Sequence, residues 1–312
     1  MSKKKIAVFF EKPNFEDYPF DNEEYCKAYY EFAKVVEQKG GEFFIVRGYK
    51  NHLGNTKFKI GWDWNGSEFK KTGEFTANAI YDKGRLANTA YLRKNTKAKI
   101  LNPNPIVEVC NNKFKTYQLF RKFCPRTEIA LNQVQFFEAL EKIKSALKVI
   151  KPLDSYGGNG VVIGDIEKLK TVQPKFPILI QEFIDTSAGI PGIDSVNSYH
   201  DFRMIIVNGK IVHSFARTPP KDGSLTASVA RGGTYHEIKI GKIPSSAIQI
   251  FNNIDQKFKD YHRVYSIDLG FNQSRQPKII ELNSQPGLHS SKWSAGFINF
   301  QEKLADALLN FN

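Results

Sequence analysis

Apolar residues near the start of the chain follow the spacing of two strands with a helix between them. Lys5–Phe10 is a short run of branched and aromatic residues, which predicts a strand. From Asn22 to Lys39, apolar residues recur at helical spacing, and Gly40-Gly41 ends the helix. The apolar helical face consists of Tyr25, Ala28, Tyr29, Phe32, Val35 and Val36. Glu42–Arg47 predicts the second strand, and this β-α-β order favours a parallel sheet.

The next segment, from Gly48 to Thr76, is rich in aromatic residues and lysine but has no clear period. It predicts a hairpin or an insertion. Two further short strands are expected at Ala79–Tyr81 and Lys99–Leu101. An Asn-Pro-Asn-Pro run at residues 102–105 then interrupts any regular element, so we place a domain boundary just beyond it.

The middle of the chain alternates helices and strands. Helices are predicted at Lys113–Phe123 and Asn132–Ser145. Strands are predicted at 147–151, 161–163 and 178–184, with a Gly-rich loop at 152–160 and a second loop at 185–197.

The last third begins with a predicted hairpin. Asp201–Val207 and Lys210–Arg217 are apolar runs joined by Asn208-Gly209, a strong short signal for a β-hairpin. Period two places Ile211, His213, Phe215 and Arg217 on one face of the return strand. A polar loop follows at 218–233, then a helix at 245–261, strands at 264–271 and 278–283, and a helix at 297–310.

Composition excludes several classes of protein. Hydrophobic residues make up 41% of the 312 residues and charged residues 25%, as in ordinary globular proteins. The apolar run that follows Met1–Lys5 stops at Glu11, too early for a signal peptide, and no stretch approaches about 18 continuous apolar residues. We therefore expect a cytoplasmic protein. Three widely spaced cysteines (Cys26, Cys110 and Cys124) argue against a disulfide framework or a zinc knuckle.

The formal net charge of +13 leaves several partners open. A basic surface can serve nucleic acid, anionic small ligands or acidic peptides, or can simply be solvated lysine. Only ten of the 45 basic residues are arginines, and the lysines are scattered along the chain. Proteins that read nucleic-acid sequence cluster arginine and aromatic residues on one element, which disfavours nucleic acid here.

The loop between the strands at 147–151 and 161–163 can bind phosphate. Gly157, Gly158 and Gly160 expose backbone N–H groups that can surround phosphate oxygens, and Lys151 adds a positive charge at the strand end. The chain contains no G-x-x-x-x-G-K-[ST] motif. Taken alone, such a loop between strands is more often a simple turn.

Two predicted strands near residue 280 carry oxygen ligands. Glu281 and Asn283 are two residues apart and share a strand face, and Asp268 can approach them if the strands pair. Two carboxylates and an amide oxygen suit Mg²⁺ held together with nucleotide phosphates. The alternative is a solvated face on an edge strand.

The predicted hairpin at 201–217 carries charged residues among apolar ones. Asp201 and Arg203 share a face, and Arg217 ends the return strand. Charges in such a setting need a partner or a ligand, so either an Asp–Arg ion pair or a bound anion would explain them. Arg231, next to Gly232-Gly233, adds another cation beside flexible backbone.

The order of these motifs is more specific than any one of them. A helix starts at Asn112-Lys113, then come Lys151 with its Gly-rich loop and an apolar strand that ends at Gln181–Ile184. Asp201-x-Arg203 follows, and then Asp268 with Glu281-x-Asn283-x-x-Pro286-Gly287. This series resembles the ATP-grasp superfamily, most closely the branch of glutathione synthetases and ribosomal-protein glutamate ligases. The resemblance covers Asn112 to the C-terminus; the first third matches only in its β-α-β order.

The resemblance implies a role for each motif. Lys113 and Lys151 would contact the phosphates of ATP, and the loop from Ser155 to Gly160 would close over them. The adenine site would be lined by Gln181, Glu182, Phe183 and Ile184. Mg²⁺, for which Mn²⁺ can substitute, would be held by Asp268, Glu281 and Asn283. The γ-phosphate and a substrate carboxylate would face Arg203, Arg217 and Arg231.

The resemblance also implies an α/β fold and an activity. A Rossmann-like N-terminal domain (1–107) would precede two α+β lobes (108–185 and 186–312) that sandwich ATP. The implied enzyme is a carboxylate–amine ligase that acts through an acylphosphate on an amino acid or peptide and releases ADP and phosphate. The alternatives are an ATP-grasp kinase and a basic polyanion-binding protein on a degenerate scaffold. We expect small acids, amines or peptides as partners, no specific nucleic acid and no membrane, and leave homo-oligomerisation open.

Overall fold

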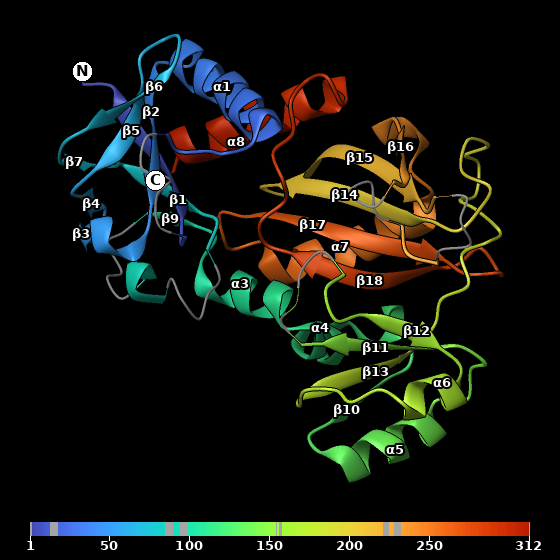
Figure 1. Ribbon diagram of the computed structural model, residues 1–312. Coiled ribbons are helices and arrows are strands. Elements are labelled where there is room, and N and C mark those ends of the chain that lie inside the picture. The colour runs from blue at the N-terminus through green and yellow to red at the C-terminus, as the bar shows by residue number, and fades with distance from the viewer. Residues whose placement is uncertain are drawn as a thin grey trace.

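The described residues fold into three β-sheets of four to six strands each, with helices packed against them. A small fourth sheet lies beside the first (Figure 1). The computed structural model describes residues 2–12, 18–84, 90–93, 99–153, 155, 158–220, 225–227 and 232–311. The expected α/β fold, with an N-terminal sheet followed by two further lobes, is confirmed.

The first sheet has the strand order β6-β5-β2-β1-β8-β9. Its strands are β1 (Lys4–Phe10), β2 (Gly41–Arg47), β5 (Gly61–Trp64), β6 (Phe69–Thr72), β8 (Ala79–Asp82) and β9 (Ile100–Leu101). β1 pairs in parallel with β2 and β8, and β8 pairs in parallel with β9, as the β-α-β order predicted. β5 and β6 extend this sheet in the antiparallel direction.

The aromatic segment 48–76 is an insertion with sheet structure of its own. Besides β5 and β6 it contributes a 3₁₀ turn and a small sheet, namely η1 (Tyr49–Asn51), β3 (His52–Gly54), β4 (Lys57–Phe58) and β7 (Phe75–Thr76). Phe75 stacks on Phe44 of the larger sheet with ring centroids 4.2 Å apart. Phe58 and Phe75 therefore cover one face of the first sheet, together with Leu92 of η2 (Ala90–Arg93). The aromatic residues of β5 and β6 pack in the core on the other face, namely Trp62, Trp64 and Phe69.

Two helices from opposite ends of the chain cover the other face of the first sheet. α1 (Glu23–Gln38) is capped by the Asn22 side chain, and Gly40 follows it with φ of 81°, a conformation that favours glycine. α8 (Ala295–Leu309) packs beside α1 and also contacts the third sheet. One hydrophobic core therefore runs from the first sheet through both helices to the third sheet (Figure 1).

The second sheet is antiparallel, with the order β10-β13-β11-β12. Its strands are β10 (Thr127–Ala130), β11 (Lys148–Pro152), β12 (Val162–Gly164) and β13 (Ile178–Glu182). α5 (Gln133–Lys142) and α6 (Ile166–Lys170) cover one face. β10 and α6 were missed by the sequence analysis because four or five residues are too few to show a period.

The third sheet is antiparallel, with the order β16-β15-β14-β17-β18. Its strands are β14 (Asp201–Val207), β15 (Lys210–Thr218), β16 (Thr234–Glu237), β17 (Val264–Phe271) and β18 (Pro277–Asn283). The predicted hairpin turn is confirmed, since Asn208 and Gly209 have φ of 45° and 78°. α7 (Ser245–Phe258) and α3 (Asn104–Asn111) pack on one face, with η5 (Ile240–Lys242) before α7.

Three sequence predictions need correction. The Asn-Pro-Asn-Pro run at 102–105 does not interrupt every regular element, because α3 begins at Asn104 and proline is favoured in the first turn of a helix. The helix predicted at Lys113–Phe123 ends at Phe120 as α4 (Lys113–Phe120), and a 3₁₀ turn, η3 (Arg121–Phe123), completes the segment. Ile211 does not share a face with Phe215, because the register shifts between Ile205 and Ile206. Ile211 packs against the core on the α7 side, whereas Phe215 belongs to the core that contains α8.

Within the described ranges, no helix combines the length and apolar character needed to cross a membrane.

Buried polar contacts connect the first sheet to the loop after β18. Asn102, just after β9, donates from Nδ2 to the carbonyls of Val264 and Ser284, both at 2.6 Å, and accepts from Val264 N at 2.7 Å. Lys83, just after β8, donates to the carbonyls of Gln285 and Pro286 at 3.0 and 2.9 Å. The carboxyl ends of two parallel strands therefore fix the loop that follows Asn283.

We expect Asn102→Ala to lower the free energy of unfolding by about 3 kcal/mol, because it leaves buried backbone groups of Val264 and Ser284 without partners. Urea denaturation followed by circular dichroism measures this change. The control is Asn253→Ala, which removes a solvent-exposed hydrogen bond to the Gln249 carbonyl and should cost about 0.5 kcal/mol. Equal losses in the two variants would contradict a special role for the Asn102 contacts.

Candidate functional site

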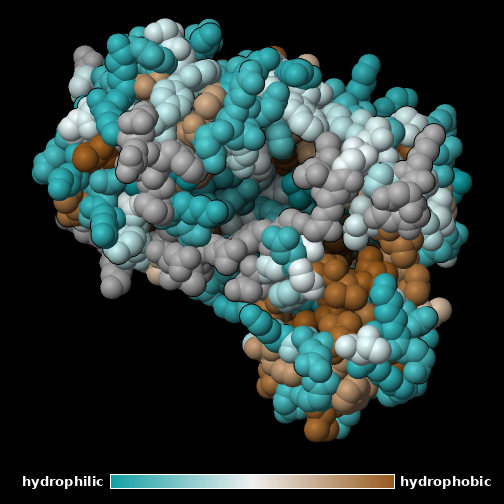
Figure 2. Space-filling view, viewed as in Figure 1, coloured by the Kyte–Doolittle hydropathy of each residue, from teal (hydrophilic) through white to brown (hydrophobic). Residues whose placement is uncertain are grey.

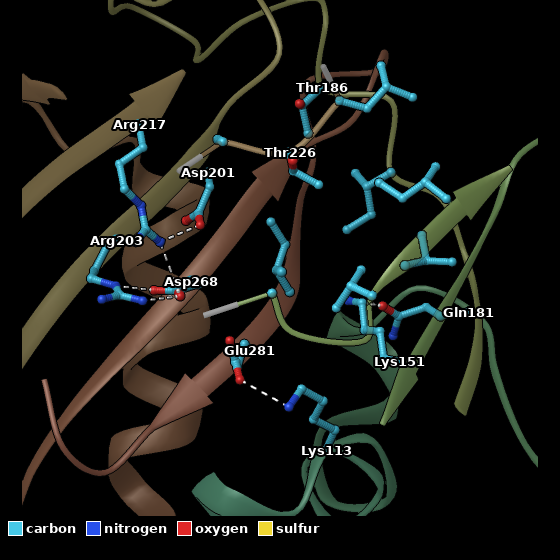
Figure 3. Close-up of a pocket in the computed structure, with 18 of the residues that line it drawn as sticks. Lys113, Lys151, Gln181, Thr186, Asp201, Arg203, Arg217, Thr226, Asp268 and Glu281 are labelled. Atoms are coloured by element: carbon cyan, nitrogen blue, oxygen red, sulfur yellow. Dashed lines mark hydrogen bonds and ion pairs between the residues drawn. The ribbon is translucent and has the colours of Figure 1, made fainter. Parts of the chain in front are cut away.

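A cavity of about 370 Å³ lies between the second and third sheets. Figure 2 shows the molecule hollowed between the lobe that carries α5 and α6 and the rest of the chain, with apolar residues on that side. The apolar lining comes from Val149, Val161, Ile163, Ile184 and Ile280. The charged lining comes from α4, β11 and the strands of the third sheet (Figure 3).

Most residues singled out from the sequence meet in this cavity. Its walls include Lys113, Lys151, Ser155, Gly158, Gln181, Glu182, Phe183, Ile184, Arg203, Arg217, Asp268, Glu281 and Asn283. Gly160, with φ of 71°, lies in the same loop but does not line the cavity. Gly157 and Arg231 lie outside the described residues.

Lys151 is a buried cation that contacts a neutral partner. Its Nζ donates to Gln181 Oε1 at 2.7 Å, and Figure 3 shows the two side chains together on neighbouring strands. Burial lowers the pKa of Lys151 to about 8, although Glu281 acts in the opposite direction. A lysine with this pKa gains much from a bound anion, because the anion supplies the charge compensation that Gln181 cannot give.

Lys113 joins the Gly-rich loop to the third sheet. The Asn112 side chain caps α4 by accepting from the N–H groups of Phe114 and Lys115, which fixes the first turn on which Lys113 lies. Lys113 Nζ donates to the Ser155 carbonyl at 2.6 Å and lies 3.2 Å from Glu281 Oε1. Both lysines proposed for phosphate binding therefore reach the cavity, one from each side of the loop.

The oxygen ligands form one wall of the cavity. Asp268 on β17 lies directly opposite Glu281 on β18, and Ser266 lies opposite Asn283. The strand pairing that the sequence analysis required is thus present, and the three side chains share one face. Asn283 Nδ2 lies 3.4 Å from Asp268 Oδ2, so the trio converges.

This donor set fits Mg²⁺, which prefers carboxylate and amide oxygens. In the structure, cations already lie against the wall. Asp268 accepts from Arg203 Nε and Nη2 at 2.6 and 2.5 Å, and Glu281 pairs with Lys113. Asp268 is buried and Glu281 is half-buried, and two such carboxylates side by side repel each other unless positive charge compensates them. The wall is therefore a site where a cation is stabilised.

Arg217 and Asp201 form a second ion pair beside the first. Arg217 Nη2 donates to Asp201 Oδ2 and also lies 3.5 Å from Asp268 Oδ2. Burial raises the pKa of Asp201 to about 6, with Arg217 acting against that rise. For Arg203, burial acts to lower the pKa, but Asp268 outweighs it and the pKa is raised. Asp–Arg ion pairs, one of the two interpretations of this hairpin, are therefore present.

Three buried polar atoms near the cavity have no hydrogen-bond partner among the described residues. They are Ser155 Oγ, Asp201 Oδ1 and Arg217 Nε. Buried polar groups are normally paired, so unpaired ones beside a cavity indicate where a ligand supplies the missing contacts. A ligand group that accepts a hydrogen bond from Arg217 Nε, and another that donates to Asp201 Oδ1, would lie on the side of the cavity formed by the third sheet.

The sequence analysis did not assign several cavity residues. Thr186, His200, Leu225, Thr226, Ala227 and Gln285 line the walls, as do Asp201 and Pro286, which it noted without a site role. Val149, Val161 and Ile163 could have been found from period two around the loop, since they alternate with Ile150 and Val162, which pack on the opposite face of the sheet. Thr226 lies in a polar loop without a period, so no local signal marks it.

Two lysines, from α4 and β11, and a Gly-rich loop face carboxylates of the third sheet across one cavity, as expected of a two-lobed, nucleotide-binding protein. Comparison with known proteins agrees with this class. A family model for the RimK-like ATP-grasp domain matches residues 110–308.

Curated relatives share this part of the chain. A probable alpha-L-glutamate ligase from Cellvibrio japonicus is 28% identical over 181 residues, which are 55% of this chain and 54% of that protein. Its counterpart from Aeromonas salmonicida is 27% identical over 222 residues, 67% of this chain and 68% of that protein. The matches span between about half and two thirds of these relatives.

Solved structures share the fold over nearly the whole length. A RimK domain ATP-grasp protein from Sphaerobacter thermophilus has a TM-score of 0.65 at 14% identity and covers 98% of this chain and 100% of its own. D-alanyl-alanine synthetase A from Vibrio cholerae has a TM-score of 0.66 at 10% identity, over 100% and 99% of the two chains. The chain belongs to the RimK-like ATP-grasp family, which confirms the resemblance noted in its sequence.

The pKa of Lys151 sets an expected pH dependence. Below about pH 8 the free protein carries an ammonium there, and above it the ammonium fraction falls about tenfold per pH unit, so phosphate should bind more weakly. We expect the Kd for ATP with Mg²⁺ to rise about tenfold between pH 8 and 9.5, measured by isothermal titration.

The groups that act on the pKa of Lys151 are Glu281, Lys113, Cys124 and Asp201. Lys151→Ala should bind ATP more weakly throughout and lose this pH dependence. Lys115→Ala, which removes an exposed lysine paired with Glu108, should keep both affinity and pH profile. The same pH profile in Lys151→Ala as in the unmodified protein would assign the titration to another group.

Proposed function

We propose that this protein is an ATP-dependent carbon–nitrogen ligase that joins a carboxylate to an amine. The observation that carries the proposal is the cavity between the second and third sheets. It holds two lysines beside a Gly-rich loop, facing a wall of two carboxylates and an amide. That arrangement, in a chain of the RimK-like ATP-grasp family, suits phosphoryl transfer to an acid.

We place ATP in the cavity with its phosphates at the lysines and its base at the apolar lining. Its phosphates would lie against Lys151 and Lys113, with backbone N–H groups near Gly158 and the Ser155 hydroxyl adding contacts. Its base would lie against the apolar lining near Val149 and Ile163, beside the residues from Gln181 to Ile184 that end β13. This placement gives Ser155 Oγ the partner that it lacks.

Mg²⁺, or Mn²⁺ in its place, would be held by Asp268, Glu281 and Asn283. The metal would neutralise phosphate charge during transfer. With Asp268 so engaged, Arg203 and Arg217 become available to an anion from the same side of the cavity. Asp201 keeps Arg217 in position, because that ion pair does not involve Asp268.

The proposed reaction has two steps. A substrate carboxylate attacks the γ-phosphate, which gives an acylphosphate and ADP. An amine then attacks the acyl carbon, loses a proton and displaces phosphate, which gives the amide. Arg203, Arg217 and the predicted Arg231 would stabilise the negative charge that shifts between phosphate and acid.

The names of the relatives support a proposal for the substrate class. The relatives are named as ligases of alpha-L-glutamate, so we propose an amino acid or a peptide as substrate. An ATP-grasp kinase would release ADP without needing an amine, and the assay below separates the two. A polyanion-binding protein would not require the complete set of cavity ligands.

Substitution of a proposed metal ligand tests this function. A screen of amino acids and short peptides with MgATP should identify an acid and an amine that release phosphate only together. With that pair, Glu281→Gln and Asn283→Ala should each lower turnover by about 10³-fold while circular dichroism stays unchanged. Glu302→Gln on the exposed side of α8 is the matched control and should keep full activity. Substantial ligation by Glu281→Gln at ordinary Mg²⁺ would refute the metal assignment, and phosphate release without an amine would refute the ligase.

The variant Arg217→Ala should weaken the binding of the acid substrate more than the binding of ATP. Arg217 Nε lacks a partner and faces the side where we place the acid, so its loss removes a charged contact to the carboxylate. We expect the KM for the acid to rise about 30-fold and the KM for ATP by less than about threefold, in steady-state assays of phosphate release. A larger effect on ATP would place Arg217 at the nucleotide instead.

A further inference from the structure

A chain of hydrogen bonds crosses three neighbouring strands of the second sheet. Thr127 on β10 lies directly opposite Gln181 on β13, and Gln181 Nε2 donates to Thr127 Oγ1 at 2.8 Å. Lys151 on the adjacent β11 donates to Gln181 Oε1 at 2.7 Å. Thr127 Oγ1 in turn donates to the Pro125 carbonyl at 2.9 Å. All three side chains are buried.

The direction of every bond in this chain is determined by chemistry. The Pro125 carbonyl can only accept, so it takes the single hydroxyl proton of Thr127. Thr127 Oγ1 is then left with lone pairs and must accept from Gln181, which places the amide nitrogen on the β10 side. The amide oxygen consequently faces Lys151, and this is the orientation that an ammonium requires.

We propose that Thr127 is a positioning residue for nucleotide binding, which fixes the amide of Gln181 and through it the ammonium of Lys151. The proposal rests on the proposed function, in which Lys151 binds ATP phosphate. One of three N–H groups of Lys151 is held by Gln181, so the other two point in defined directions toward the cavity. Thr127 itself does not line that cavity.

Loss of the Thr127 hydroxyl frees the Gln181 amide to rotate. In the rotated state the amide nitrogen faces Lys151, so two donors oppose each other and the ammonium moves from its place. Weaker charge-assisted bonds to phosphate follow, because these bonds depend on alignment. The effect should therefore appear in the binding of ATP and leave the binding of the acid and the amine unchanged.

Three variants at position 127 test the proposal by steady-state kinetics with MgATP and the acid–amine pair found in the screen. Thr127→Val keeps the side-chain shape without a hydroxyl and should raise the KM for ATP about tenfold. Thr127→Ser restores the hydroxyl and should return the KM to within about twofold. Thr127→Ala removes the hydroxyl without adding a methyl group in its place, and serves if valine does not fold.

Thr171→Val is the control. Its hydroxyl donates to the Lys168 carbonyl on the same lobe, away from the cavity, so its removal should leave the KM for ATP unchanged. Thermal unfolding of every variant shows whether a change in KM merely follows a loss of stability. A rise in KM that Thr127→Ser does not reverse would overturn the proposal.

A double-mutant cycle tests whether Thr127 acts through the hydrogen-bonded chain Thr127–Gln181–Lys151, called the relay below, or only through packing. Gln181→Met removes the amide, so Thr127→Val should have little further effect on the KM for ATP in that background. Full additivity of the two changes would overturn the relay. If Lys151→Ala weakens ATP binding but Thr127→Val does not, the relay alone is wrong. If Lys151→Ala also leaves ATP binding unchanged, Lys151 does not bind the nucleotide, and the proposed function of Lys151 and the relay are both wrong.

Discussion

Charge compensation inside a closed cleft is the constraint on which this structure depends. The cavity between the second and third sheets collects acidic and basic side chains from α4 and from strands of both lobes, and none of them can be buried alone at low cost. Arg203 and Arg217 hold Asp268 and Asp201, and Lys113 holds Glu281. Lys151 differs, because its hydrogen-bond partner is the uncharged Gln181. The protein's own side chains therefore balance the charge at the wall of carboxylates, but they leave Lys151 beside the Gly-rich loop, where phosphates would bind, without a hydrogen-bonded carboxylate.

The same face of the third sheet serves two purposes along its length. At one end, Ile205, Val207 and Phe215 pack in the core that contains α8. At the other end, Arg203, Arg217 and Asp268 face the cavity. Because the apolar residues at one end of these strands are packed in the core, they hold in place the charged residues at the other end. Asn102 and Lys83 fix the loop after Asn283 from the first sheet, so the proposed metal ligands are supported from both sides.

Much of this could be read from the sequence, where the signal was local. The strands around residues 5, 45, 205, 215, 267 and 280 were long and apolar enough to show, and Asn208-Gly209 marked its turn. Period two placed Glu281 and Asn283 on one face of their strand. The wall of carboxylates then required only that Asp268 lie opposite them on the neighbouring strand, as it does. The role proposed for Thr127 could not be predicted from the sequence. Its strand has only four residues, and the role depends on a hydrogen bond with Gln181, which lies 54 positions further on. Ile211 was assigned to the wrong face because a register shift at Ile205 and Ile206 leaves no trace in the pattern of residues.

The position of α8 has a consequence for synthesis on the ribosome. α8 completes the core against α1 and β1, elements that end by residue 38. Translation runs at about 5–20 residues per second, so some 260 further residues take roughly 13–50 s to emerge. During that interval part of the apolar face of the first sheet lacks its cover. The nascent chain therefore exposes these apolar side chains until α8 is made, and its earliest-made sheet is among the last parts to reach its final packing.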